Sequence, residues 1–151
     1  MTYDSWKDTL EHIQNVQLKI HVVVQDLLHR AIIHDASKLQ PPEKEVYDSN
    51  PAQLSTIEYG TNDYKSAKDK VQVALNHHYS VSPHHPEYYI DGVDGMNFLD
   101  LLEMLVDWKC STERTKNGDL KKSIEINAEQ FNMSEQLKQI LLNTASYLEW
   151  I

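Results

Sequence analysis

Glycine and proline are scarce in this 151-residue chain, and their positions divide it into a few long uninterrupted segments. The five prolines lie at 41, 42, 51, 83 and 86, and the four glycines at 60, 92, 95 and 118. Because these residues are the strongest breakers of helices, the segments between them favour helices. No segment alternates apolar and polar residues for long enough to suggest a sheet. The sequence therefore predicts an all-α helical bundle.

The first three helices are predicted from the spacing of their apolar residues and from signals at their starts. Apolar residues recur at helical spacing from about Ser5 to Leu39, with a break expected near His29. The segment "PPEKEVYDS" predicts a short helix, because proline in the first turn and acids near the start favour a helix N-terminus. A polar loop over 50–60 then leads into a longer helix over "NDYKSAKDKVQVALNHHY". In this helix His78 shares a face with apolar residues at 71, 74 and 75.

The second half of the chain carries clear helix caps. The segment "SPHHPEYYIDGVDG" predicts a loop, after which Asn97 caps a helix over "NFLDLLEMLVDWKCSTER". Asp100 lies three residues after Asn97, as in a capping box with a shorter acid. Asp119 and Ser134 are expected to cap the last two helices. Cys110 and the tryptophans are expected to pack in or beside the core, the tryptophans being Trp6, Trp108 and Trp150.

Length and charge limit the classes of function. A chain of 151 residues suggests one domain with a single core. The net charge of −9 argues against general binding to a nucleic-acid duplex, although it allows a small anionic substrate. No apolar run is long enough to span a bilayer, and the acidic, amphipathic start does not resemble a signal peptide. The single cysteine excludes an internal disulfide, and we expect a cytoplasmic protein.

Eight histidines are the most distinctive chemical feature, and four of them lie in "HHYSVSPHH". Imidazole is the commonest protein ligand for transition metals. His34 and Asp35 follow the apolar run "AII", and Asp107 lies within "LLEMLVDW". Ionisable groups in such surroundings are costly unless they are paired or coordinate a metal. A metal site and a buried hydrogen-bonded pair both remain open, and the histidine-rich loop could also be merely solvated.

Three segments resemble the HD-domain superfamily of metal-dependent phosphohydrolases. "RAIIHDASKL" is similar to that family's signature of two hydrophobic residues, HD and a lysine three residues later. "EHIQNVQ", with His12, is similar to the helix that carries the family's first histidine, and His21 is the rival of His12. "LEMLVDWKCSTER", with Asp107, resembles the late helix that supplies the last aspartate.

The resemblance implies a single HD-like helical domain over 1–151, with the metal-site core at about 9–114 and C-terminal helices at 119–151 packing on it. It implies one or two divalent ions, drawn from Mn, Fe, Co, Ni, Zn or Mg. The first ion would be held by His12, His34, Asp35 and Asp107. A second would be bridged by Asp35 and bound by two histidines of the 77–85 stretch. His78 and His85 are preferred for this role, with His77 and His84 as alternatives, and some of these histidines could instead hold a phosphate.

The resemblance also implies hydrolysis of a small phosphate ester, with a nucleotide as the expected substrate. Asp35, Lys38, His78 and His85 are then the expected catalytic residues, and Lys38 would hold the substrate phosphate or an acid near the metal. A two-iron monooxygenase is a rarer outcome of the same ligands. A non-catalytic, metal-stabilised helical binding module is the alternative outside enzymes, and a homodimer remains open for either. "HHPEYY" also resembles the active-site string of pterin-4a-carbinolamine dehydratases, which combine helix with sheet.

Overall fold

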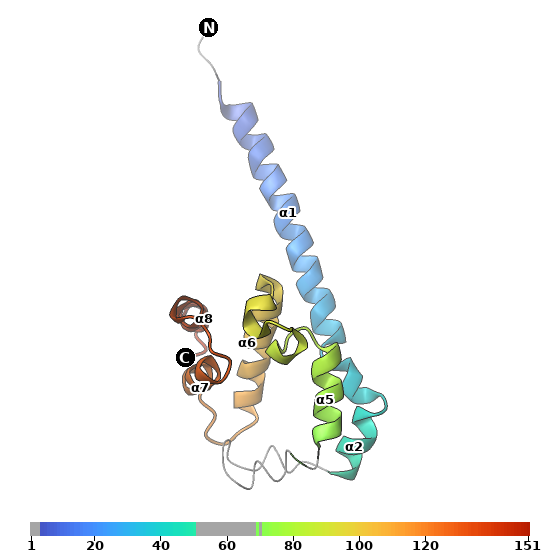
Figure 1. Cartoon of the computed structure of the whole chain (residues 1–151). Helices are drawn as coiled ribbons and strands as arrows, with labels where there is room; N and C mark the ends of the chain where they lie inside the picture. Colours follow the sequence, from blue (N-terminus) through green and yellow to red (C-terminus); the bar gives the residue numbers. More distant parts are fainter. Residues whose placement is uncertain (1–3, 51–68, 70) are drawn as a thin grey trace. The chain divides into compact units, whose positions relative to one another are not determined.

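The computed structural model describes residues 4–50, 69 and 71–151, and every regular element in these residues is helical (Figure 1). The all-α prediction is therefore confirmed. The chain forms two compact units, residues 1–34 and 35–151. The first unit holds one helix, and the second holds eight described elements. These nine are α1 (Trp6–Ile33), η1 (Ala36–Leu39), α2 (Glu43–Ser49), α5 (Gln72–Val81), η2 (Pro86–Tyr88), η3 (Gly92–Gly95), α6 (Phe98–Glu113), α7 (Leu120–Gln130) and α8 (Glu135–Tyr147).

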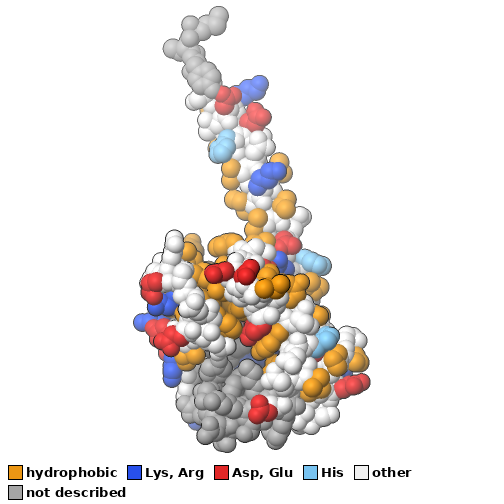
Figure 2. Space-filling model, in the orientation of Figure 1, with side chains coloured by type: hydrophobic (Ala, Val, Ile, Leu, Met, Phe, Trp, Pro, Cys, Tyr) orange, Lys and Arg blue, Asp and Glu red, His pale blue; other side chains and the backbone are white. Residues whose placement is uncertain are grey.

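The helix of the first unit continues past the point where its sequence predicted a break. The break predicted near His29 is wrong, because α1 continues to Ile33 without interruption. Arg30 and Asp26 form an ion pair of 2.8 Å one turn apart, and this contact stabilises the helix across the expected break. Figure 2 shows hydrophobic and charged side chains interspersed along α1. The packing role expected of Trp6 in this unit stays a prediction.

The second unit begins with a sharp change of chain direction. Asp35 has φ 58°, in the left-handed region that aspartate tolerates better than most residues, and the 3-10 helix η1 starts directly after it. The predicted short helix is confirmed as α2, which packs against η1 and α5. The loop predicted at 50–60 and the first part of the next predicted helix lie outside the described residues. Its later part is α5, where Ala74 and His78 are buried as predicted. On the same predicted face, Val71, the residue before the helix, is buried and Leu75 is half-buried.

The predicted capping box of α6 is present and extends into the loop before it. The Asn97 side chain accepts hydrogen bonds from the backbone N–H groups of Leu99 (2.8 Å) and Asp100 (3.1 Å). In return, the fully buried Asp100 carboxylate accepts from the Asn97 N–H (2.9 Å) and the Tyr89 hydroxyl (2.7 Å). Side-chain caps at Asp119 and Ser134 begin α7 and α8, also as predicted.

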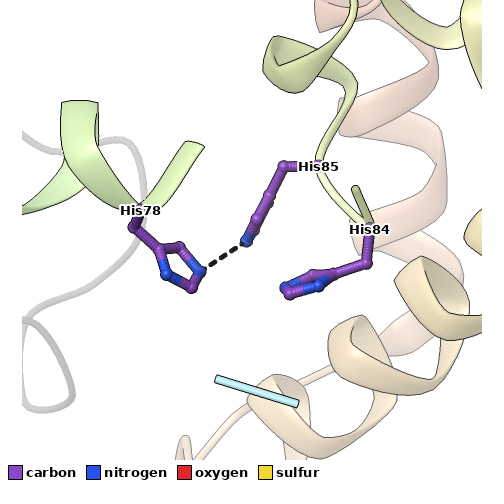
Figure 3. A group of neighbouring side chains, drawn as sticks. All are labelled: His78, His84 and His85. Atoms are coloured by element: carbon purple, nitrogen blue, oxygen red, sulfur yellow. Dashed lines mark hydrogen bonds between the residues drawn. The ribbon is translucent and has the colours of Figure 1, made fainter. Parts of the chain in front are cut away.

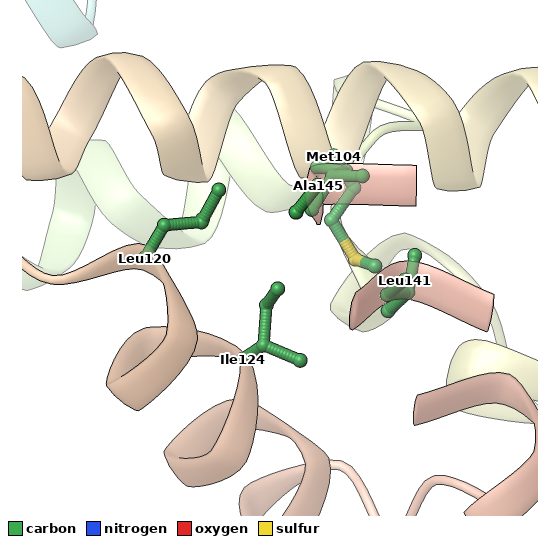
Figure 4. Packing of buried hydrophobic residues seen from close by; sticks show 6 residues of the cluster. Met104, Leu120, Ile124, Leu141 and Ala145 are labelled. Atoms are coloured by element: carbon green, nitrogen blue, oxygen red, sulfur yellow. The ribbon is translucent and has the colours of Figure 1, made fainter. Parts of the chain in front are cut away.

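The hydrophobic core of the second unit lies where α6, α7 and α8 meet (Figure 4). Its buried side chains are Met104, Leu105, Leu120, Ile124, Leu141 and Ala145. Trp108 and Trp150 pack against it, as expected. The C-terminal helices α7 and α8 therefore pack on α6. Cys110 is exposed, so its predicted packing role is wrong: it follows Trp108 by two residues, which places it on the other side of the helix.

Among the described residues, no helix combines the length and apolar character that crossing a bilayer requires.

The capping box yields a prediction about stability. Asn97→Ala removes the acceptor for two backbone N–H groups, so we expect it to lower the free energy of unfolding by about 1 kcal/mol. Asn143→Ala is the matched control, because Asn143 is exposed inside α8 and alanine favours a helix interior. Urea unfolding followed by circular dichroism measures both. An Asn97→Ala protein as stable as wild type would contradict the role of the cap.

Candidate metal centre

Three histidines converge in the second unit, as Figure 3 shows. His78 lies near the end of α5, and His84 and His85 lie in the loop between α5 and η2. Each offers one ring nitrogen, and these three atoms all lie within 4.8 Å of one another. The Nε2 atoms of His78 and His85 are 3.0 Å apart. His78 and His84 are buried and His85 is half-buried, so the cluster is largely shielded from solvent.

Asp35 brings a carboxylate to the same place. Its Oδ1 atom lies 3.2 Å from Nε2 of His78 and 3.7 Å from Nε2 of His84. Its other oxygen, Oδ2, accepts a hydrogen bond of 2.6 Å from the Lys38 ammonium group. The left-handed backbone at Asp35 turns the chain at this point. Three imidazoles and one carboxylate therefore form a compact donor set, which we call the His₃Asp cluster.

In both His78 and His84, the second ring nitrogen, Nδ1, also lies close to a carboxylate. Nδ1 of His78 lies 3.1 Å from Oε2 of Glu43, and the Ser37 hydroxyl forms a hydrogen bond of 3.0 Å with the same nitrogen. Nδ1 of His84 lies 3.4 Å from Oε1 of Glu103 on α6. A metal-binding histidine typically has such a partner behind it, which orients the ring and fixes the nitrogen that carries the hydrogen. The donor set and its surroundings therefore fit a divalent metal.

His77, the neighbour of His78, faces a different partner. Its Nδ1 atom lies 2.7 Å from Oε1 of Glu43, whose side chain is completely buried. His78 is therefore the histidine of this pair that belongs to the His₃Asp cluster, and its role as a metal ligand stays a prediction. His84 and His85, which were alternatives for one position, both belong to it.

The surroundings of the cluster keep the His85 ring neutral. Burial is the main cause that lowers the pKa of His85 from 6.5 to about 3; the neighbouring His84 and His78 contribute to this shift, and the charge of Asp107 opposes it. A neutral imidazole keeps a lone pair for a metal.

Nearby, burial and the carboxylates of Glu43 and Asp35 raise the pKa of Tyr47 to about 12, so this phenol stays protonated at neutral pH.

The remaining predicted site residues occupy different places. Asp107 lies on α6, half-buried, close enough for its charge to influence His85. Lys38 contacts Asp35 directly, as its place in the sequence pattern suggested. His12 is exposed in the middle of α1, and His34 closes that helix and immediately precedes Asp35 in the chain. Both histidines belong to the first unit, and their roles as metal ligands stay predictions.

Sequence reasoning missed the residues behind the ligands. Glu43 was interpreted only as an acid in the first turn of a helix, and neither Ser37 nor Glu103 was singled out. Glu43 lies directly before a lysine and two residues before another acid, which is the pattern of a solvated helix start. Its burial results from the packing of α2 against α5, which are far apart in sequence.

The low pKa of His85 predicts how the stability of metal-free protein depends on pH. As the pH falls below about 6.5, the unfolded chain takes up a proton at His85 while the folded chain does not until about pH 3. The free energy of unfolding of the metal-free protein therefore falls progressively as the pH drops through this range. In chelator-treated protein, lowering the pH from about 7 to about 5 should reduce the melting temperature of His85→Gln less than that of wild type. Equal losses in the two proteins would contradict a neutral, buried His85.

Comparison with known families shows where this chain belongs. Neither the curated proteins nor the solved structures provided a match. One family model does match, over residues 1–147, and it carries the description "Family of unknown function (DUF5662)". Because the match covers nearly the whole sequence, the chain is a member of the DUF5662 family.

Proposed function

We propose that this protein is a metal-dependent phosphohydrolase that acts on a small phosphate ester, with its metal held by the His₃Asp cluster. The observation that carries the proposal is the convergence of His78, His84, His85 and Asp35. These residues come from three separate segments of the second unit. They lie together in a largely buried place, and carboxylates lie behind two of the rings. This arrangement supports a functional role rather than a purely structural one.

The chemistry of the donors narrows the choice of metal. Imidazole nitrogen suits zinc, iron, cobalt and nickel, whereas magnesium and calcium prefer oxygen ligands. Three imidazoles with one carboxylate therefore favour a transition metal over magnesium. A bound divalent ion of this kind lowers the pKa of a coordinated water and polarises a phosphoryl oxygen.

Lys38 supplies the positive charge that a phosphate requires. Its ammonium group lies 2.6 Å from Asp35 Oδ2, and its side chain is 37% exposed. It can therefore reach an incoming phosphate oxygen without leaving the edge of the cluster. The charge of Lys38 also contributes to the lowered pKa of His85. This placement supports Lys38 as the residue that holds the substrate.

Two finer parts of the proposal rest on the resemblance to HD-domain proteins. One is a nucleotide as the substrate. The other is a second metal ion beside the one held by the His₃Asp cluster. For the dehydratase alternative, the described residues contain no β-strand, so this interpretation gains no support. A non-catalytic metal-binding module is distinguished from an enzyme by the experiment that follows.

The proposal predicts loss of activity when two cluster histidines are removed. Protein treated with chelator and reloaded with manganese, cobalt or zinc should hydrolyse an aryl phosphate or a member of a nucleoside monophosphate panel. His78→Ala with His85→Ala should reduce turnover by orders of magnitude, because half of the proposed ligands are gone. His29→Ala, at an exposed histidine of α1, should leave turnover unchanged. Metal-loaded wild type without any hydrolysis would indicate the non-catalytic alternative.

Asp35→Asn separates a metal ligand from a structural acid. Asparagine tolerates the left-handed backbone at position 35, so the metal-free fold should melt within a few degrees of wild type. Metal affinity should fall by about 10-fold or more, because an anionic ligand is lost. Asp48→Asn is the control, since Asp48 also pairs with a lysine but is exposed on α2.

The contrary pattern for Asp35→Asn is equally clear. If Asp35 only holds Lys38, the variant would melt early and retain both its metal affinity and any hydrolysis. Calorimetric titration with zinc and a thermal melt with and without chelator distinguish the two patterns.

A further inference from the structure

Glu43 is the most deeply buried acid in the neighbourhood of the His₃Asp cluster. It is the first residue of α2, and its side chain is 0% exposed. Oε1 of its carboxylate lies 2.7 Å from Nδ1 of His77, and Oε2 lies 3.1 Å from Nδ1 of His78. A buried carboxylate is costly without partners, so its position between two imidazoles calls for an explanation.

We propose that Glu43 is a positioning residue for the metal: it holds the hydrogen of His78 on Nδ1 and so directs the Nε2 lone pair into the His₃Asp cluster. This inference deepens the proposed function and rests on it for the presence of the metal. It concerns a residue outside the ligand set, which acts only through His78.

The argument is electrostatic. An ionised carboxylate oxygen accepts hydrogen bonds and does not donate them. At 3.1 Å from Nδ1 of His78, it attracts an N–H hydrogen and repels a lone pair. In a neutral imidazole, a hydrogen on Nδ1 leaves the lone pair on Nε2. This second nitrogen faces Oδ1 of Asp35 at 3.2 Å and Nε2 of His85 at 3.0 Å, where a metal would lie between ligands.

The Ser37 and Ser82 hydroxyls form the hydrogen bonds of Nδ1 of His78. Oε2 of Glu43, in contrast, accepts no hydrogen bond from the described residues and acts on that nitrogen through its charge. Ser37 and Ser82 lie 3.0 Å and 3.3 Å from Nδ1 of His78. A hydroxyl can accept as well as donate, so either serine accommodates an N–H on that ring. Glu43 accommodates only a hydrogen on Nδ1, whereas the Asp35 carboxylate, 3.2 Å from Nε2, favours a hydrogen on the other nitrogen. A metal ion at Nε2 would remove this second preference, and Glu43 would then decide the tautomer.

His77 explains how the Glu43 carboxylate keeps its direction. The 2.7 Å contact between Nδ1 of His77 and Oε1 holds one oxygen, which leaves the other facing His78. The adjacent histidines thus have different tasks: His78 enters the cluster, and His77 anchors the acid behind it. The corresponding pair, Glu103 and His84, is looser at 3.4 Å, and Glu103 is more exposed than Glu43.

Glu43→Gln tests the inference with almost no change of volume. The amide group must turn its NH₂ toward one of the two rings. If it faces His78, it favours a lone pair on Nδ1; if it faces His77, the oxygen facing His78 has lost its charge. In both cases the preference for the metal-binding tautomer weakens, and zinc affinity should fall by about 10- to 100-fold. Glu45→Gln makes the same change at an exposed position of α2 and should bind zinc like wild type.

A spectroscopic measurement on zinc-loaded wild type decides the matter even if Glu43→Gln fails to fold. Long-range ¹H–¹⁵N correlation spectra should show His78 with a hydrogen on Nδ1 and with Nε2 bound to zinc. A zinc-bound Nδ1, or Glu43→Gln protein with wild-type zinc affinity, would overturn the inference, as would wild type that binds no zinc. Hydrolysis is read separately: zinc binding that depends on Glu43, without turnover of any phosphate ester, refutes the proposed function and leaves the role of Glu43 intact.

Discussion

Glu43 and His78 are both almost completely removed from water, and their side chains lie 3.1 Å apart. Neither could be buried alone at an acceptable cost in free energy, because an isolated charge or an unpaired ring nitrogen loses its hydration without compensation. Each therefore depends on the other, and both depend on α2 packing against α5. The turn at Asp35 and the 3-10 helix η1 belong to the same group of contacts. Ser37 lies close to Nδ1 of His78, and Asp35 lies close to Nε2 of the same ring.

The supports of the site and the hydrophobic core of the second unit meet on α6. One side of this helix packs against α7 and α8 through Met104 and Leu105. Glu103, the preceding residue, faces His84 instead. At the start of the same helix, the buried Asp100 binds the Tyr89 hydroxyl and so ties the loop that follows His85 to the helix. A single helix thus connects apolar packing with the polar groups around the cluster, which gives the ligands a rigid support.

The sequence predicted the helices well because their signals are local. Glycine, proline and the caps at Asn97, Asp119 and Ser134 act within a few residues, and the structure confirms them. The assignment of His78 also followed from a local signal, its helical face shared with Val71 and Ala74. The closely spaced histidines at 78, 84 and 85 were harder to combine, because they meet only after the chain turns at Ser82 and Pro83. Glu43 could not be found, since its burial arises from a contact between residues 34 positions apart. The helix break near His29 failed because no local breaker enforces it.

The central claim is that the His₃Asp cluster binds a metal, and a crystal structure of protein reloaded with zinc or cobalt tests it most directly. Diffraction data collected on both sides of the metal's absorption edge should show an anomalous peak about 2.0–2.3 Å from Nε2 of His78 and from ligand atoms of its partners. The same peak should be absent from Asp35→Asn protein prepared at limiting metal. The account would be contradicted if the loaded crystal showed an anomalous metal peak elsewhere and none at His78, His84 and His85.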